Sequence, residues 1–260
     1  MRVEICVLAS GSAGNCIYVA GGGTRLLIDA GLSLKETQAR LSQLGLNMDA
    51  IQAILFTHDH ADHCQRVDVF QRRHNLAFYA NEGTTLGIEQ VAKCPDLRWQ
   101  IFETGSPFAI GGLQIEPFSV PHDAADAVGF AISDGRARLG IATDFGTATT
   151  LIRRKLTDCD ALILETNHDV EMLRQSGRPW SLIQRILGRQ GHLSNEDAAE
   201  LLTGVLGPRL RTVFLAHISA ECNTPQQAER VLRAALQRAG RDDIRLVHTS
   251  ADTISERIEL

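Results

Sequence analysis

The stretch Thr57-His58-Asp59-His60-Ala61-Asp62-His63 decides how this chain is interpreted. It places three imidazoles and two carboxylates within six consecutive positions, directly after the apolar run 51–56, which predicts a buried strand. The end of a strand is a usual place for a functional site in α/β folds. His58 and His60 alternate with Asp59, so extended backbone would point both imidazoles to the same side.

The spacing His-x-His-x-Asp-His provides four ligand-type side chains, namely His58, His60, Asp62 and His63. Asp62 and His63 follow on the next turn and can approach from another side, so the set suits two adjacent metal ions better than one. A single histidine is usually a packed or surface residue. Four such groups without a metal, however, would crowd polar side chains at a strand end. The pattern therefore predicts a metal centre.

Composition limits the class of protein. The chain has 260 residues, of which 44% are hydrophobic and 22% charged, which suits one large globular domain or two small ones. The formal net charge is -5 and the sequence pI about 6.0, so the overall charge gives no indication of a nucleic-acid partner. A polyanionic substrate would need a local basic patch together with the metals.

The six cysteines and the amino-terminal sequence indicate where the protein works. The cysteines are scattered without a Cys-x-x-Cys pair, which is typical of reduced thiols in a cytosolic protein. The first residues carry one basic side chain and an apolar run too interrupted for a signal peptide. No stretch approaches the ~20 apolar residues that span a bilayer. We therefore expect a soluble, cytoplasmic protein with no membrane partner.

Apolar runs bounded by turn residues predict the remaining elements. Strands are expected at 3–8, 16–20, 25–29, 51–56, 77–80, 99–103, 113–120, 128–133, 139–143, 161–164 and 212–216. Helices are expected at 34–44, 61–73, 84–93, 180–189, 195–206 and 225–239, with Ser194 and Thr224 as N-caps. No linker, repeat or low-complexity segment interrupts the chain, so we expect one domain over residues 1–260.

Six polar residues each follow a predicted strand: Asp29, His58, His122, Asp144, His168 and His217. Taken singly, each is more readily a capping aspartate or a surface histidine. Together, beside the histidine stretch, they favour a site at one edge of stacked sheets. This arrangement fits an α/β protein with an αββα sandwich.

The His-x-His-x-Asp-His signature resembles that of the metallo-β-lactamase superfamily. The resemblance implies one metal held by His58, His60 and His122, and another held by Asp62, His63 and His217. It implies that Asp144, in Ala142-Thr143-Asp144-Phe145-Gly146, touches both metals, and that Asp29 supports the site from behind. The true β-lactamases have a cysteine at the position of Asp144, which argues against that activity here.

Within the superfamily the chain resembles the bacterial YycJ/WalJ-type proteins. The matching motifs are Ser10-Gly11-Ser12-Ala13-Gly14-Asn15-Cys16, Asp29-Ala30-Gly31-Leu32-Ser33, Leu164-Glu165-Thr166-Asn167-His168-Asp169 and Gly191-His192-Leu193-Ser194-Asn195. Cys222 departs from the family pattern, which has asparagine or histidine there. The resemblance implies a 5′-to-3′ exonuclease acting on DNA and connected with mismatch repair.

The ligands suggest the chemistry. Two divalent ions about 3.5–4 Å apart lower the pKa of a bridging water and clamp a phosphate during in-line displacement. Imidazole and carboxylate without thiolate suit zinc or manganese, and iron also fits. The candidate catalytic residues are Asp62 and Asp29, with Asp29 orienting a ligand or the water. His192 and His168 complete the set, because either could bind the scissile phosphate or protonate the leaving oxygen.

Several alternatives remain open from the sequence. His192 could instead be a helix-terminal residue beside the Ser194 cap. Basic clusters at 72–73, 153–155 and 174–189 could follow a phosphate backbone, although charged helix faces are usually only solvated. A small-molecule metallohydrolase acting on a thioester or cyclic phosphodiester is the alternative enzyme, favoured by a deep closed pocket. A metal-stabilised scaffolding protein without turnover is the alternative from another class.

Overall fold

The computed structural model describes residues 3–65, 67–94 and 97–260, and its centre is a pair of stacked β-sheets. The first sheet contains β1 (Glu4–Ala9), β2 (Cys16–Gly21), β3 (Thr24–Ile28), β4 (Ala53–Leu55), β5 (Ala77–Ala80), β6 (Trp99–Ile101) and β14 (Ile258–Glu259). The second contains β7 (Phe108–Ile110), β8 (Leu113–Ser119), β9 (Val128–Ser133), β10 (Arg138–Ala142), β11 (Ala161–Glu165), β12 (Thr212–Ala216) and β13 (Arg245–His248).

Both sheets are mixed and have seven strands. The first has the order β14-β1-β2-β3-β4-β5-β6 and the second β13-β12-β11-β10-β9-β8-β7. From β3 to β6 and from β10 to β13 neighbouring strands are parallel, and the other pairs are antiparallel. Parallel strands end at the same edge of a sheet, so each sheet brings several strand ends, and the residues that follow them, together.

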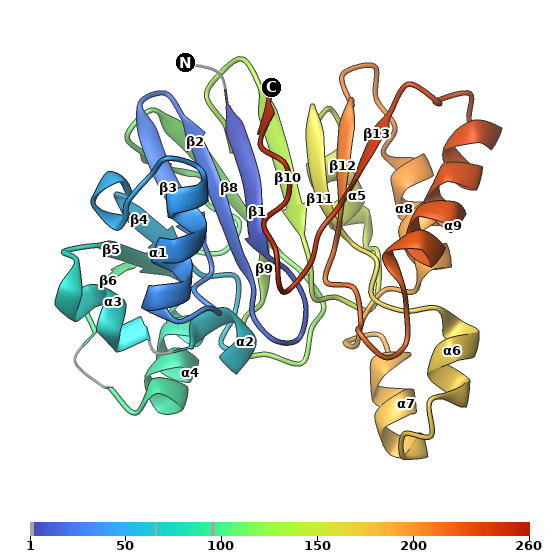
Figure 1. The fold of residues 1–260 in the computed structure, drawn as a ribbon, viewed down its shortest axis with the longest axis horizontal. Helices are drawn as coiled ribbons and strands as arrows, with labels where there is room; N and C mark the ends of the chain where they lie inside the picture. Colours follow the sequence, from blue (N-terminus) through green and yellow to red (C-terminus); the bar gives the residue numbers. More distant parts are fainter. Residues whose placement is uncertain (1–2, 66, 95–96) are drawn as a thin grey trace.

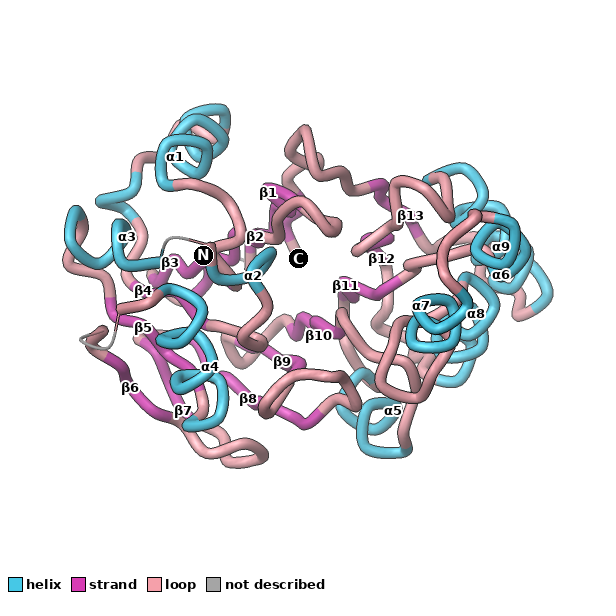
Figure 2. Tube along the Cα trace, turned by 90° about the horizontal axis from the view of Figure 1, so that it is seen from below, coloured by secondary structure: helices cyan, strands magenta, loops and turns pink. Residues whose placement is uncertain are grey.

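Helices cover the outer face of each sheet (Figure 2). On the first sheet these are α1 (Leu34–Gln43) and α3 (Val67–Arg73), while α2 (Ala61–Cys64) and α4 (Glu82–Ala92) lie at the lower end of that sheet in Figure 1. On the second they are α5 (Thr150–Leu156), α8 (Asn195–Gly204) and α9 (Pro225–Arg238). Two short helices, α6 (Val170–Gln175) and α7 (Trp180–Ile186), extend beyond the sheets (Figure 1). The predicted αββα sandwich is confirmed.

The core lies in three layers, because the central strands are buried on both faces. In β3, Leu26 and Ile28 point between the sheets, while Leu27 packs under the helices of the first sheet. In β11, Ile163 points inward and Leu162 packs under the helices of the second sheet. Burial on both faces explains why these strands are continuous apolar runs in the sequence.

Most predicted elements are confirmed within a few residues, and the Ser194 and Thr224 side chains cap α8 and α9 as predicted. The single helix predicted at 61–73 is wrong. α2 ends at Cys64, Gln65 is extended, and α3 begins at Val67; Arg66 lies outside the described residues. The helix stops because other segments occupy its carbonyls: Asn15 N donates to Asp62 O at 2.8 Å, and Ala30 N donates to His63 O at 2.7 Å.

Some short elements were not predicted. The helices α5 and α6 have seven and six residues, and the strands β13 and β14 lie at sheet edges. Such segments bury too few side chains to produce a clear periodic pattern. Within the described part of the chain, no helix combines the length and apolarity needed to cross a membrane.

Candidate metal centre

Titratable side chains that follow different strands converge at one end of the sandwich. Asp29 follows β3 directly, and His58 lies a few residues after β4 in the loop before α2. His122, Asp144 and His217 come after β8, β10 and β12. The histidine stretch together with His122, Asp144, His217, Glu165 and His192 forms four groups, and within each group the ligand-type atoms lie within 4.8 Å of one another; Asp29 belongs to none of them.

Three of these residues have strained backbone. Asp29, Asp144 and His217 have φ values of 63°, 60° and 55°. This left-handed conformation is uncommon for residues other than glycine, and it persists where surrounding contacts fix it. The centre therefore concentrates strain at the strand ends that supply its polar groups.

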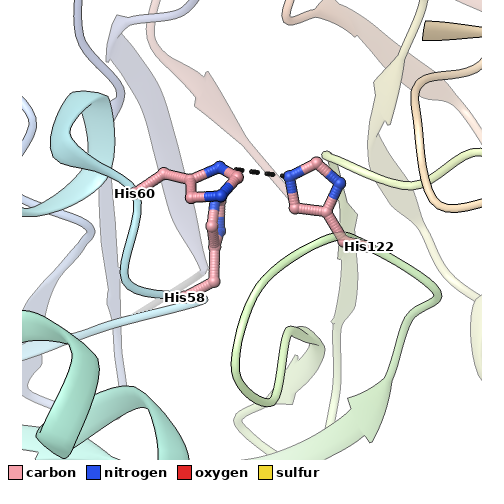
Figure 3. A group of neighbouring side chains, drawn as sticks. All are labelled: His58, His60 and His122. Carbon is pink, nitrogen blue, oxygen red and sulfur yellow. Dashed lines mark hydrogen bonds between the residues drawn. The ribbon is translucent and has the colours of Figure 1, made fainter. Parts of the chain in front are cut away.

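The first group contains His58, His60 and His122, whose rings face one another (Figure 3). His60 Nδ1 lies 3.3 Å from His122 Nε2. The Nε2 atom of His58 is buried and has no hydrogen-bond partner among the described residues. A buried nitrogen without a partner is costly, and a bound cation would satisfy it.

The second group contains Asp62, His63 and His217. Asp62 Oδ2 lies 3.5 Å from His63 Nε2 and 3.7 Å from His217 Nε2. The Nε2 atom of His217 is also buried without a partner in the described part of the chain. Asp62 is half-buried, so this side of the centre reaches solvent.

Asp144 lies between the groups. Its Oδ2 is 3.4 Å from His63 Nε2 and has no hydrogen-bond partner among the described residues. Its Oδ1 is 3.2 Å from His217 Nδ1. Asp144 also belongs to two of the four groups, one with His58 and His63 and one with His217 and His192. The arrangement lets one carboxylate contact two neighbouring cations.

Asp29 fixes the orientation of two histidines from behind. Its Oδ2 accepts hydrogen bonds from His63 Nδ1 at 2.8 Å and from the Thr57 hydroxyl at 2.9 Å. The same hydroxyl, already donating to Asp29, accepts from His58 Nδ1 at 2.9 Å. Because each Nδ1 carries the proton, each Nε2 turns its lone pair away from Asp29; that of His58 has no partner among the described residues, and that of His63 lies 2.9 Å from Asn15 Nδ2.

Glu165 does the same on the other side, and the sequence analysis did not single it out. This fully buried carboxylate ends β11. Its Oε1 accepts from His192 Nδ1 at 2.7 Å and from His217 Nδ1 at 3.1 Å, and its Oε2 accepts from Phe145 N at 2.9 Å. An acid at the end of an otherwise apolar buried strand was the available signal, because a buried charge needs partners.

The structure places the two remaining candidate histidines differently. The His192 ring lies between the two groups, 5.3 Å from the His122 ring centroid and 5.2 Å from that of His217. His168 lies outside all four groups, with its carbonyl accepting from Asn195 N at 2.9 Å. Neither ring nitrogen of His168 has a partner among the described residues, and burial lowers its pKa to about 4.

The pKa values show that the carboxylates require positive charge nearby. Burial alone would lower the pKa of His63, but Asp144 and Asp29 outweigh it and raise this pKa to about 9. At His217 the Asp144 carboxylate likewise outweighs the effect of burial and raises the pKa of this histidine well above its usual value. Burial lowers the pKa of His58 well below its usual value, which keeps this imidazole neutral.

Without a cation, protons on His63 and His217 balance the charge of the carboxylates. A divalent ion would replace these protons. The residues therefore fit divalent metal ions.

Two loops outside the ligand set hold the histidine stretch in place. Asn15, in the turn after β1, donates through Nδ2 to Asp62 Oδ2 at 3.2 Å, and its carbonyl accepts from Gly31 N at 2.9 Å. Gly31 packs so closely that a Cβ there would lie 1.7 Å from Asp62 O and 2.5 Å from Asn15 N. Only glycine allows this approach.

We expect Gly31→Ala to lower the metal content per chain, because the added methyl group displaces the backbone that carries Asp62 and His63. Metal analysis and a thermal melt of the purified variant measure the effect. Gly207→Ala is the control, because its Cβ would make only an ordinary contact with Asp158, at 3.4 Å. Wild-type metal content in Gly31→Ala would show that this close contact is not needed.

Comparison with known proteins gives consistent matches. The family described as "Beta-lactamase superfamily domain" matches residues 24–218. The chain is 37% identical to the exodeoxyribonuclease YycJ of Bacillus anthracis over 241 residues, 92% of this chain and 91% of that protein. It is 35% identical to the exodeoxyribonuclease WalJ of Streptococcus pneumoniae over 260 residues, 98% of this chain and 97% of that protein. The metallo-β-lactamase fold protein YhfI from Bacillus subtilis superposes with a TM-score of 0.73 at 14% identity, over 98% of this chain and 99% of that one. These names do not mention mismatch repair, so that link stays a prediction.

Proposed function

Because this chain belongs to the β-lactamase superfamily, and within it to the YycJ/WalJ-type proteins, we propose that it is a metal-dependent exodeoxyribonuclease that degrades DNA from the 5′ end. The observation that carries the proposal is the convergence of six ligand-type side chains around Asp144. Buried atoms on His58, His217 and Asp144 itself find no hydrogen-bond partner among the residues that the structure describes. The exonuclease activity comes from the relatives, and the metal chemistry from the residues.

In this proposal His58, His60 and His122 hold one divalent ion, and Asp62, His63 and His217 hold the other. Asp144 contacts both. Imidazole and carboxylate donors without thiolate favour zinc or manganese, and iron fits them as well. Ions bound there supply Lewis acidity, which polarises a phosphoryl oxygen and lowers the pKa of a water.

The residues around the ions have their own roles. Asp29 and Glu165 keep the proton of four histidines on Nδ1, which fixes the rings. His192 is held through Nδ1 by Glu165, which leaves its Nε2 on the far side of the ring from that carboxylate. From there it can hold a phosphate oxygen or donate a proton to the leaving oxygen. A substrate contact for His168 has less support, because its ring is buried outside the groups.

We expect DNA labelled at its 5′ end to release short labelled products first, because the resemblance to the YycJ/WalJ-type proteins implies attack from that end. Parallel digests of 5′- and 3′-labelled DNA, with RNA of the same sequence as control, measure the polarity. If 3′-labelled strands shorten from their labelled end first, the polarity is wrong although the nuclease proposal stands. Faster turnover of bis(p-nitrophenyl) phosphate than of any DNA would instead favour a small-molecule hydrolase.

A further inference from the structure

The segment that contains α6 and α7 differs in charge from the rest of the protein. Residues 170–191 carry four arginines and one glutamate, in a chain whose formal net charge is -5. Both helices project beyond the sheets, at the end of the sandwich where α2 lies (Figure 1). A positive segment on a negative protein, near a metal centre, is suited to a polyanion.

The two helices are fixed by a small apolar cluster of their own. Leu173 of α6 packs there with Ile183 and Ile186 of α7 and with Cys222. Arg178, between the helices, pairs with Glu221 at 2.8 Å. The position of Cys222 in this cluster gives that residue a packing role.

One large aromatic side chain stays outside the cluster. Trp180 begins α7 and is 62% exposed. Gln184 and Leu187 follow at helical spacing on the same side, and both are exposed. Arg185 lies about 7.5 Å further along the helix axis than Trp180, at 1.5 Å per residue. We call Trp180, Gln184 and Leu187 the α7 face; at 3.6 residues per turn, Arg185 lies about 140° around the helix from Trp180, on a neighbouring side.

The helix α7 is tied to the metal centre by two contacts. Arg185 pairs through Nε with the carboxylate of Asp123, which adjoins His122. The chain after α7 reaches Gln190, whose carbonyl accepts from His122 Nδ1 at 3.1 Å. A strand that crosses α7 from the α7 face to the side of Arg185 would therefore approach the centre.

We propose that the α7 face binds the unpaired strand of the DNA substrate, with Trp180 stacking on a base and the arginines of residues 170–191 contacting phosphates. The inference rests on the proposed function and names the surface that the substrate follows. An indole stacks on any base, so this contact adds affinity without sequence preference. Arg178 and Arg185 are paired with Glu221 and Asp123, so the charge that favours DNA over a protein partner comes from Arg174 and Arg189, for which the described residues provide no ion pair.

Binding of oligothymidylate in the presence of a chelator, which prevents cleavage, tests the proposal. In fluorescence anisotropy with a labelled oligonucleotide, Trp180→Ala should bind about 10-fold more weakly, and Trp180→Phe should recover most of the affinity. Trp99 is the other tryptophan and packs against Phe56 and Phe78. In a Trp99→Phe background, stacking should therefore quench the fluorescence of Trp180.

The control is Ile101→Ala, which removes an equally exposed apolar side chain (64%) on β6 and should leave DNA affinity unchanged. Turnover of bis(p-nitrophenyl) phosphate should be the same in Trp180→Ala and wild type, because this small ester does not reach α7. Unchanged DNA affinity in Trp180→Ala would overturn the inference and leave the proposed function intact. A wild-type protein that neither binds nor cleaves DNA would overturn the proposed function itself.

Discussion

Asp144→Ala is expected to reduce DNA hydrolysis by on the order of 10⁴-fold or more, the scale seen when a central catalytic group is removed. The carboxylate lies 3.4 Å from His63 Nε2 and 3.2 Å from His217 Nδ1, between the two groups of ligands. Loss of this carboxylate removes the side chain that joins the two groups of ligands. It also leaves His58 and His63 without the anionic ligand that completes their group. Metal content per chain should therefore fall together with activity.

Chelation of the wild-type protein should have the same effect, and added Mn²⁺ or Zn²⁺ should restore hydrolysis in wild type but not in the variant. His60→Ala, which removes one member of the first group, should also lose metal. Asp49→Ala serves as the control, because its side chain is 82% exposed and pairs with His74, away from the metal centre. Full activity after removal of all metal would exclude a metal-dependent mechanism.

His192→Ala is expected to keep its metals and its fold but to lose about 10²-fold or more in kcat on DNA, the usual scale for a positioned acid or phosphate contact. Burial alone would lower the pKa of His192, but the Glu165 carboxylate outweighs it and raises this pKa. The ring is thus held as a proton donor beside the centre, at a position where a leaving oxygen needs a proton.

The leaving group distinguishes the two roles proposed for His192. A p-nitrophenolate leaves without a proton, so His192→Ala should impair bis(p-nitrophenyl) phosphate much less than DNA if the residue is an acid. Equal losses on both substrates would indicate a phosphate contact. Loss of metal would make His192 a ligand, and an unchanged kcat would make it structural. His248→Ala, at a surface histidine paired with Glu229, is the control.

The sequence predicts the sandwich well because the physical cause is local. Strands buried on both faces, such as β4 and β11, are continuous apolar runs, and the ligands follow them directly. The break between α2 and α3 could not be predicted, because the carbonyls of Asp62 and His63 are occupied by segments far away in the chain. Only the fold brings those amides into reach.

The same reason explains the residues that were missed. The partners of Glu165 are His192 and His217, 27 and 52 positions away. In the sequence, Glu165 is one acid after four apolar residues, and nothing nearby shows that it orients two imidazoles. Trp180 begins a helix whose apolar residues predict burial. Its exposure follows from where α7 lies, outside the sheets.

The left-handed backbone at Asp29, Asp144 and His217 has a consequence for engineering this protein. Each such residue costs about 1–3 kcal/mol of stability, and glycine at the same position would avoid much of that cost. Glycine at Asp29 would, however, also leave the Thr57 hydroxyl and His63 Nδ1 without their acceptor, which costs a comparable free energy. A substitution at these positions therefore exchanges backbone strain for lost hydrogen bonds and lost metal. Thermostabilisation of this protein should be scored on metal retention as well as on melting temperature.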